Sequence, residues 1–170
     1  NLDMEVIVNI CKNISESTGN IVSPANINSA KQIVIAGHDH SAKIASDECK
    51  KAGASRCIKL NVSVAAHCAL MNDACKLLES ELINISFANP SIPVIHNIDG
   101  SIGKNIDNIA VNLIKQLTFP VQWVETMKRI KDFHGVVIEC GPGRVLSSLA
   151  KANGLDNIIS MSSDNFEEEF

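Results

Sequence analysis

Aromatic residues are scarce in this sequence. Tyrosine is absent, tryptophan occurs once, and aromatics make up 4% of the 170 residues, so the core must be built from Ile, Val, Leu and Ala. Apolar residues make up 45% and charged residues 20%, which is the usage of a globular protein and excludes a disordered or fibrous chain. A chain of this length can hold one ordinary domain, or a small domain together with part of a larger one.

A broad basic surface is missing as well. The 15 Lys and Arg residues are outnumbered by 19 Asp and Glu residues, so the net charge is −4 and nothing favours the phosphates of a nucleic acid. No apolar run reaches the length of about 18 residues needed to cross a membrane, and the opening residues 1–5 do not look like a signal peptide. We therefore expect a cytoplasmic protein with neither a nucleic-acid nor a membrane partner.

Closely spaced cysteine pairs are also absent. Without a C-x-x-C pair, neither a disulfide framework nor a zinc knuckle is predicted, and reduced thiols are expected. The run His38-Asp39-His40 offers two imidazoles and a carboxylate, but no further ligand cluster accompanies it, and Asp39 or Ser41 can simply cap a helix. We expect no metal and no cofactor. The six cysteines are Cys11, Cys49, Cys57, Cys68, Cys75 and Cys140.

The first third of the chain predicts a small α/β unit. Apolar spacing predicts a helix over 3–17, and β-branched runs over 21–28 and 32–36 predict an antiparallel pair. A helix over 41–52 and a short strand over 57–60 follow. This order matches a ferredoxin-like βαββαβ unit without its first strand, so residues 1–60 form an incomplete ferredoxin-like subdomain. The chain looks truncated at its start, and another polypeptide would have to supply the missing strand.

The rest of the chain alternates helices and strands, which indicates a parallel α/β layer over 61–159. The acidic, polar tail 160–170 is predicted to be frayed. The predicted elements are helices over 68–82, 106–117, 121–133 and 145–152, with strands over 92–96 and 135–140.

A few polar residues stand at positions suited to chemistry. His67 lies between the predicted strand 57–60 and the next helix, where loops present catalytic groups, although a histidine beside a helix start is more often structural. Asn26 and Asn28 project to the same side of a strand, either as hairpin residues or as polar groups lining a cleft. The turn 141–144 could present main-chain N–H groups to an anion, but a tight turn that needs glycine is the favoured explanation. His96 and His134 border apolar runs and are expected to be structural.

Five motifs occur in a fixed order along the chain. They are Val22–Ser29 (VSPANINS), Gln32–Gly37 (QIVIAG), Val62–Met71 (VSVAAHCALM), Lys115–Trp123 (KQLTFPVQW) and Glu139–Gly143 (ECGPG). Together they resemble the motifs of malonyl-CoA:acyl carrier protein transacylases, over nearly the whole chain up to about Leu155. Any one of these motifs would be a weak signal, whereas five in the right order and spacing are highly specific.

The resemblance implies a fold and a set of roles. In the family, a ferredoxin-like subdomain is inserted into an α/β-hydrolase-like core, so this chain would hold the carboxy-terminal part of that core. A serine within G-H-S-x-G attacks the malonyl thioester, and the matching histidine here is His67. The main-chain carbonyl of Gln116 orients the imidazole where a hydrolase would use an aspartate. Asn26 and Asn28 then become substrate-side residues, and Arg56 becomes the candidate contact for the acidic carrier protein.

The chain departs from the family in one large respect. G-H-S-x-G, the early G-Q-G-S motif and the malonate-binding arginine are all absent from these residues. In the family they lie upstream of the matched region, so we expect this polypeptide to be inactive alone and to need an amino-terminal half. With that half it would transfer a malonyl group from malonyl-CoA to the phosphopantetheine thiol of acyl carrier protein, in fatty acid biosynthesis.

Two other functions remain open at this point. A non-catalytic module that docks a carrier protein fits the missing serine, but it has no obvious use for the His67 loop and the Gln116 segment. An acyltransferase domain of a polyketide synthase shares the fold, although the ending after about Leu155 favours the discrete enzyme. Selectivity among acyl groups stays open, because the arginine that would read the carboxylate is not among these residues.

Overall fold

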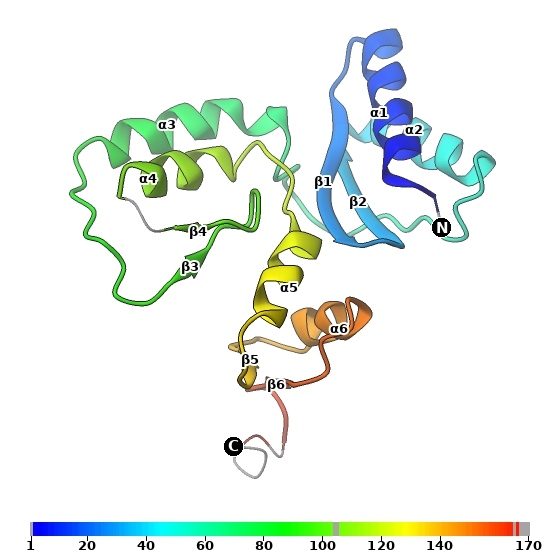
Figure 1. The fold of residues 1–170 in the computed structure, drawn as a ribbon. Coiled ribbons are helices and arrows are strands. Elements are labelled where there is room, and N and C mark those ends of the chain that lie inside the picture. The colour runs from blue at the N-terminus through cyan, green and yellow to red at the C-terminus, as the bar shows by residue number, and fades with distance from the viewer. Residues whose placement is uncertain (1, 104–105, 165, 167–170) are drawn as a thin grey trace.

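The structure is a computed structural model, and it describes residues 2–103, 106–164 and 166. Its first unit consists of helix α1 (Met4–Thr18), strands β1 (Val22–Ser29) and β2 (Gln32–Gly37), and helix α2 (Asp39–Lys51). The two strands pair in antiparallel fashion, and both helices pack on this hairpin and on each other (Figure 1).

The core of this unit follows from the apolar spacing of α1. Cys11 and Ile14 point inward and pack with Val22 and Ala45, all four being buried. Burying a side chain such as Ile14 contributes about 1.5–3 kcal/mol. The helix ends at Gly19, whose φ of 67° is the left-handed conformation that glycine adopts without strain. The predicted helix and antiparallel pair are therefore confirmed.

The start of α2 differs from the prediction. The cap position is His38 rather than Asp39 or Ser41, and its imidazole accepts a hydrogen bond at Nδ1 from the Ile21 N–H at 3.0 Å. The residue before it, Gly37, has to be glycine, because a Cβ there would lie 2.2 Å from the Ile21 carbonyl oxygen. Ser41 is fully buried inside the unit instead.

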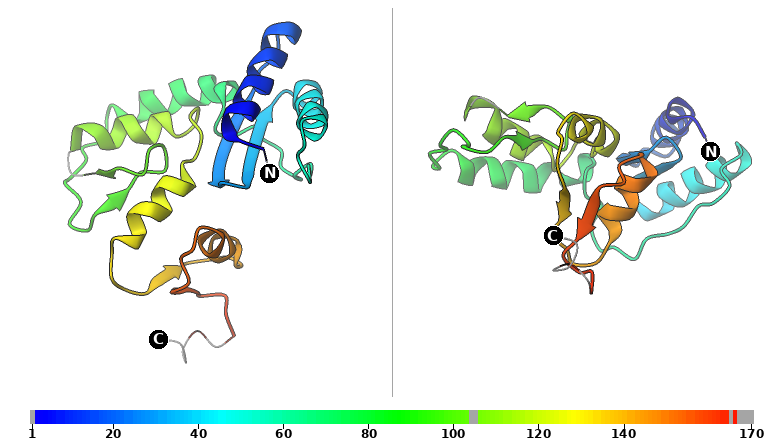
Figure 2. Two further views of the ribbon diagram at one scale, coloured as in Figure 1. Left: turned by 45° about the vertical axis from the view of Figure 1, so that its right-hand side comes forward. Right: turned by 60° about the horizontal axis from the view of Figure 1, so that its bottom comes forward.

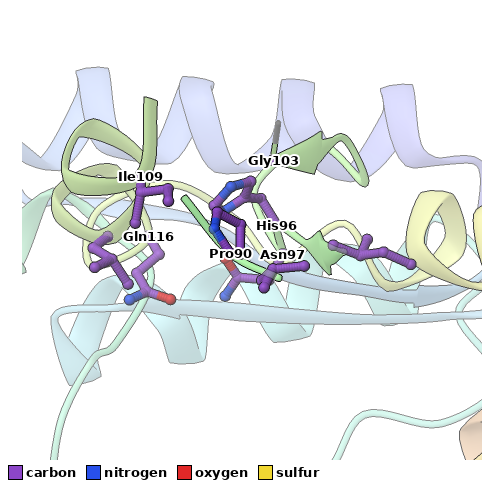
Figure 3. A pocket seen from close by; sticks show the side chains of 9 residues that line it. Pro90, His96, Asn97, Gly103, Ile109 and Gln116 are labelled. Atoms are coloured by element: carbon purple, nitrogen blue, oxygen red, sulfur yellow. The ribbon is translucent and has the colours of Figure 1, made fainter. Parts of the chain in front are cut away.

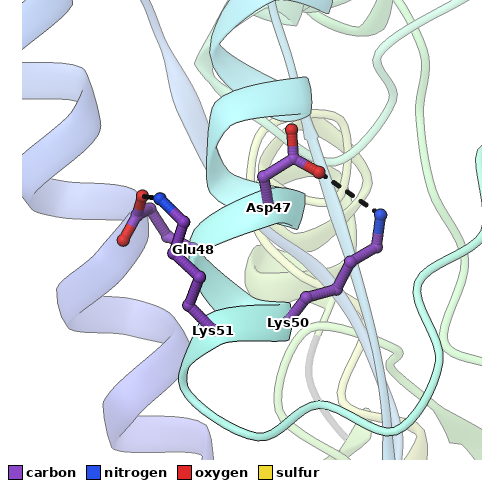
Figure 4. Close-up of polar contacts among 4 residues, drawn as sticks. All are labelled: Asp47, Glu48, Lys50 and Lys51. Carbon is purple, nitrogen blue, oxygen red and sulfur yellow. Dashed lines mark hydrogen bonds and ion pairs between the residues drawn. The ribbon is translucent and has the colours of Figure 1, made fainter.

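Helix α2 carries two exposed ion pairs, and each joins residues three apart in the sequence (Figure 4). Lys50 Nζ lies 3.3 Å from Asp47 Oδ1, and Lys51 Nζ lies 2.6 Å from Glu48 Oε1. Ion pairs on an exposed helix surface are screened by solvent and contribute little, so burial rather than charge holds the unit together.

The predicted strand over 57–60 is wrong, since these residues have no regular secondary structure. A strand needs a neighbour to take its main-chain hydrogen bonds. Among the described residues the sheet of this unit holds only β1 and β2, so no strand lies where residues 57–60 could pair.

The second unit is a helical layer over a short hairpin. It comprises the 3-10 helix η1 (Ala69–Met71), helix α3 (Asn72–Leu82), strands β3 (Val94–Ile95) and β4 (Ile102–Gly103), and helix α4 (Ile106–Lys115). Strands β3 and β4 are antiparallel, and α4 packs on both β4 and α3. The predicted strand over 92–96 is thus shorter than expected, and β4 was not predicted.

The third unit lies beyond α5 (Trp123–Lys131) and contains β5 (Val137–Glu139), α6 (Val145–Ala152) and β6 (Ile158–Ser160) (Figure 2). Strands β5 and β6 are parallel, and Met127, Ala150 and Leu155 form the buried cluster between the helices and this pair. The α/β class is confirmed. The described residues form three two-stranded sheets, of which only β5–β6 is parallel, rather than the single parallel layer expected.

The segment between α4 and α5 ties the units together. The Val121 N–H donates to the Ala25 carbonyl and the Ile27 N–H donates to the Val121 carbonyl, both at 2.8 Å, so this segment runs along the free edge of β1. From α6, Asn153 Nδ2 donates to the Asn28 carbonyl at 2.8 Å. The chain that follows Gln116 is therefore fixed against the small unit.

The acidic tail begins with ordered residues, contrary to the prediction. Ser160 is the last residue of β6, and Ser162 Oγ accepts a hydrogen bond from the Gly143 N–H at 3.0 Å. The rest of that prediction falls partly on residues 165 and 167–170, which lie outside the described residues.

None of the described helices is long and apolar enough to cross a membrane.

Candidate active site

His67 lies in a tight turn just before η1, and its main chain is unusual. Its φ is 61°, the left-handed conformation that residues other than glycine seldom adopt. Holding such a conformation costs on the order of 1–3 kcal/mol, and it persists only where the surroundings impose it. An outlier of this kind on a half-buried histidine is typical of a functional position.

The imidazole of His67 is held by a hydrogen bond to the main chain. His67 Nδ1 lies 2.6 Å from the main-chain carbonyl oxygen of Gln116, so the two groups that the family resemblance pairs are in hydrogen-bond contact. A carbonyl oxygen can only accept, so Nδ1 carries the hydrogen. In the neutral ring, Nε2 then has a free lone pair and can take up a proton from a neighbouring hydroxyl or thiol.

The Gln116 carbonyl is available because α4 ends one residue earlier. The helix stops at Lys115 instead of continuing to about residue 117 as predicted, and the N–H groups of Thr118 and Phe119 both turn back to the Lys115 carbonyl. Carbonyls at the end of a helix lack partners within it and carry the negative end of its dipole. The site therefore offers the histidine a hydrogen-bond acceptor that fixes which ring nitrogen carries the hydrogen.

A cavity of about 310 Å³ lies between the β3–β4 hairpin and α4, and Gln116 forms part of its wall (Figure 3). Its lining is mainly apolar, from residues such as Val94, Ile109 and Leu113. His96 is buried, as expected of a structural histidine, but its Nε2 has no hydrogen-bond partner among the described residues. Gly103 faces it so closely that a Cβ there would lie 2.5 Å from this nitrogen.

The other predicted site residues, Asn26, Asn28 and Arg56, lie on or near the first unit of the fold. Asn28 is buried and Asn26 half-buried on β1, and no hydrogen bond joins either side chain to His67 among the described residues. Their link to the site runs through the main chain, since Asn26 bridges to Val121, in the segment that follows Gln116. Arg56 is exposed in the stretch that follows α2, where a partner could reach it.

The N-terminus of α6 is already occupied by a carboxylate. Glu139 accepts hydrogen bonds from the N–H groups of Leu146 and Ser147, both at 2.9 Å, and from Ser147 Oγ at 2.5 Å. Burial acts to raise the pKa of the Glu139 carboxyl, but these three hydrogen bonds outweigh it and bring the pKa below its ordinary value of 4.5. An external anion has no free donors at Leu146 and Ser147, which agrees with a structural role for the glycine turn.

Two of these arrangements escaped the sequence reasoning. The first is the cap in which Glu139 accepts from the N-terminus of α6 across the glycine turn. A glutamate at the end of a strand just before a helix was the sequence signal that could have predicted it. The Cys68 thiol donates to the Ala65 carbonyl at 3.1 Å, across the turn that holds His67. Cysteine is a weak donor and gives no pattern that predicts such a bond.

Similarity to known proteins accounts for both the motifs and the fold. The chain is 43% identical over 152 residues to the malonyl CoA-acyl carrier protein transacylase of Escherichia coli K12, covering 88% of the chain and 48% of that relative. It is 40% identical over 174 residues to the Haemophilus influenzae protein of the same name, covering 99% of the chain and 55% of the relative. No protein-family model matches the chain.

Solved structures agree with these relatives. The crystal structure of FabD from Acinetobacter baumannii superposes with a TM-score of 0.91 at 34% identity, covering 99% of this chain and 54% of that one. A malonyl-transacylase in complex with a type II PKS acyl-carrier protein, PlMCAT:AntF, superposes with a TM-score of 0.85 at 42% identity, covering 94% and 51%. The chain thus spans about half the length of these proteins. It belongs to the malonyl CoA-acyl carrier protein transacylase family and corresponds to its carboxy-terminal part.

Proposed function

We propose that this chain supplies the proton-transfer part of a malonyl-CoA:acyl carrier protein transacylase, with His67 as general base. The observation that carries the proposal is the hydrogen bond from His67 Nδ1 to the Gln116 carbonyl, because it leaves Nε2 as the basic nitrogen. The nucleophile is a serine in an amino-terminal half of the enzyme, since these residues contain no G-H-S-x-G. A pure docking module would have no use for a histidine held in this way.

The proposed reaction consists of two thioester exchanges. The serine hydroxyl gives its proton to His67 Nε2 as its oxygen attacks the malonyl carbonyl, and the CoA thiolate leaves and takes that proton from the imidazolium. The phosphopantetheine thiol of acyl carrier protein then gives a proton to the same nitrogen and attacks the malonyl-serine ester. The serine oxygen leaves and recovers the proton, so His67 and the serine return to their starting states.

Three further residues complete the proposal. Asn26 and Asn28, on the strand that Val121 borders, are assigned to the substrate side of the site. Arg56 is assigned to the carrier protein, whose acidic surface and phosphate favour an exposed cation. The relative PlMCAT has been solved in complex with an acyl-carrier protein of this kind, AntF.

The amino-terminal half is proposed to complete both parts of the chain: the ferredoxin-like subdomain (residues 1–60) and the hydrolase-like core (residues 61–159). Support comes from a strip of exposed apolar side chains that leads to His67. Ile58, Leu60, Val62 and Val64 alternate along the chain and are 60%, 50%, 71% and 55% exposed. Alternation with period two marks one face of an extended segment. A strand from the other half would pair with the main chain of this segment, and other residues of that half would pack on its apolar face.

The first experiment measures malonyl transfer from malonyl-CoA to acyl carrier protein. The 170-residue chain should be inactive alone and should become active when joined to the matching amino-terminal part of the Escherichia coli relative. A second joined enzyme, with the serine of that part changed to alanine, is the control. Transfer by the chain alone at the rate of a complete enzyme would refute the proposal.

A second experiment tests the strip. Val62→Ser should change the unfolding free energy of the chain alone by less than about 0.5 kcal/mol, because the side chain is exposed there. In the joined enzyme the same change should cost about 1.5–3 kcal/mol, the value of a buried apolar side chain. Equal effects in the two proteins, measured by urea unfolding, would mean that the other half does not cover the strip.

A further inference from the structure

Cys68, the residue after His67, is the most completely enclosed group near the candidate active site. Its side chain is 0% exposed, whereas His67 is half-buried and Ala66 is exposed. The Cys68 thiol donates a hydrogen bond to the Ala65 carbonyl at 3.1 Å. This contact joins the two residues that flank the Ala66-His67 turn, so it closes the turn from inside the protein.

The turn needs such a closure because His67 has a left-handed main chain, with φ at 61°. Residues other than glycine leave this conformation unless neighbouring contacts impose it. On the far side of the turn the Met71 N–H donates to the Cys68 carbonyl at 3.0 Å and starts η1. On the near side, residues 61–64 are exposed and belong to no regular element. The thiol is therefore the one side-chain link from the described residues that fixes the Ala65 end of the turn.

We propose that Cys68 is a positioning residue for His67, an inference that rests on the proposed role of His67 as general base. Its thiol holds the turn closed, and the closed turn directs Nδ1 of His67 to the Gln116 carbonyl. Without this link the His67 main chain relaxes toward the ordinary negative φ, and the imidazole leaves the carbonyl. Nε2 then no longer points consistently at the serine of the other half.

Two variants distinguish the hydrogen bond donated by the Cys68 thiol from the volume that its side chain fills. Cys68→Ser keeps a donor of similar size, whereas Cys68→Ala fills most of the space without one. Cys49 is the matched control, since it is also buried but lies in α2 and donates no hydrogen bond among the described contacts. Cys49→Ala removes the same atom from a buried position in α2.

The first measurement is ¹⁵N and ¹H NMR of His67 in the 170-residue chain. The unaltered chain, Cys68→Ser and Cys49→Ala should show His67 with its hydrogen on Nδ1 and slow exchange of that proton. Cys68→Ala should exchange it at least about tenfold faster and show a mixture of tautomers, because the carbonyl no longer fixes one form. Identical His67 signals in Cys68→Ala and the unaltered chain would overturn the proposal.

The second measurement is steady-state kinetics in the joined enzyme. Cys68→Ala should lower kcat about 10- to 100-fold, the effect of a displaced acid-base group, with KM for malonyl-CoA changed less than about twofold. Cys68→Ser should recover most of kcat. An equal loss in Cys68→Ser and Cys68→Ala would show that packing volume matters rather than the donor, and would overturn the proposal.

A third measurement does not depend on a variant that folds poorly. In the Raman spectrum of the unaltered chain, the S–H stretch of Cys68, identified by its loss in Cys68→Ser, should be shifted to lower frequency as in a thiol that donates. A band at the position of a thiol without an acceptor overturns the inference. His67→Ala in the joined enzyme tests the proposed function separately, because full activity of this variant would refute His67 as the general base. If His67→Ala loses activity but Cys68→Ala keeps an unchanged kcat, only the role of Cys68 is refuted.

Discussion

The carboxylate cap of α6 leads to a prediction about stability that can be worked out from its hydrogen bonds. Glu139 accepts from three donors, and two of them, the Ser147 N–H and Oγ, share one carboxylate oxygen. In Glu139→Gln the amide oxygen can keep those two, but the amide NH₂ then faces the Leu146 N–H. One main-chain donor is left without an acceptor, which costs about 1–3 kcal/mol, and losing the negative charge at the helix N-terminus costs about 0.3–1 kcal/mol more. The expected total is about 1–4 kcal/mol.

Urea unfolding at pH 7 measures this difference, and Glu125→Gln is the matched control. Glu125→Gln is the same chemical change at an exposed position. Glu125 Oε1 lies 2.8 Å from Lys128 Nζ, and losing this exposed ion pair should cost about 0.3–0.5 kcal/mol. A fall in the urea midpoint with an unchanged m-value is expected for Glu139→Gln. Equal losses in the two variants would refute the cap as a stabilising feature.

The same cap gives a pH dependence with a definite sign. Because hydrogen bonds bring the pKa of Glu139 below its ordinary value of 4.5, the folded state binds this proton less readily than the unfolded state. The stability it contributes is fully present above about 4.5 and is lost as the pH falls through the lower folded pKa. The gap between the unaltered chain and Glu139→Gln should therefore narrow toward pH 3, and a gap that stays constant from pH 7 to about pH 3 would contradict this reasoning.

Three other predictions concern the candidate site and the cysteines. In the joined enzyme, His67→Ala should lower kcat by about two to four orders of magnitude and Gln116→Ala far less, since alanine keeps the main-chain carbonyl; a severe loss in Gln116→Ala would mean that its side chain acts instead. Arg56→Glu should weaken use of the carrier protein more than use of CoA, in kcat/KM measured with each, and equal effects would refute that contact. Burial, and to a smaller extent Cys49, raises the pKa of the Cys11 thiol to about 12, whereas Cys140 is exposed. Iodoacetamide at pH 8 should therefore label Cys140 long before Cys11, as measured by mass spectrometry. Similar labelling rates would show that the core around Cys11 opens readily.

Local periodicity predicted the helices well because most of their stabilising contacts repeat along one face. In α1 the spacing that includes Ile10, Cys11 and Ile14 gave the correct helix, and two of these residues are buried. Helix ends were less accurate, as at α4, where the Lys115 carbonyl accepts from the N–H groups of Thr118 and Phe119 and the helix stops early.

Strands were predicted less well because their hydrogen bonds come from distant parts of the chain. β6 is three residues long, and only its pairing with β5 defines it. The segment over 57–60 has the composition of a strand but no partner among the described residues. A sequence pattern can propose a strand, but it cannot supply the neighbour.

The candidate site could be predicted only in part for the same reason. His67 and Gln116 lie 49 residues apart in the sequence, and no periodicity relates them. Resemblance to a family predicted the pair, and the structure shows the hydrogen bond that joins the two residues. The Cys68 contact, in contrast, spans only three residues, yet it escaped prediction because the strained main chain of His67 that gives it meaning appears only in three dimensions.

The two sides of the His67 turn are supported very differently, and this difference bears on how the enzyme assembles. After the turn, the buried Cys68 and η1 fix the chain, and Gln116 holds the ring. Before the turn, the strip from Ile58 to Val64 is exposed and unpaired among the described residues. If the amino-terminal half pairs with this strip as proposed, it brings its serine to the site and fixes the segment that leads into the turn in the same step. Positioning of the base and delivery of the nucleophile would then depend on one interface, so a variant that weakens pairing at the strip should lower kcat even though it touches neither His67 nor the serine.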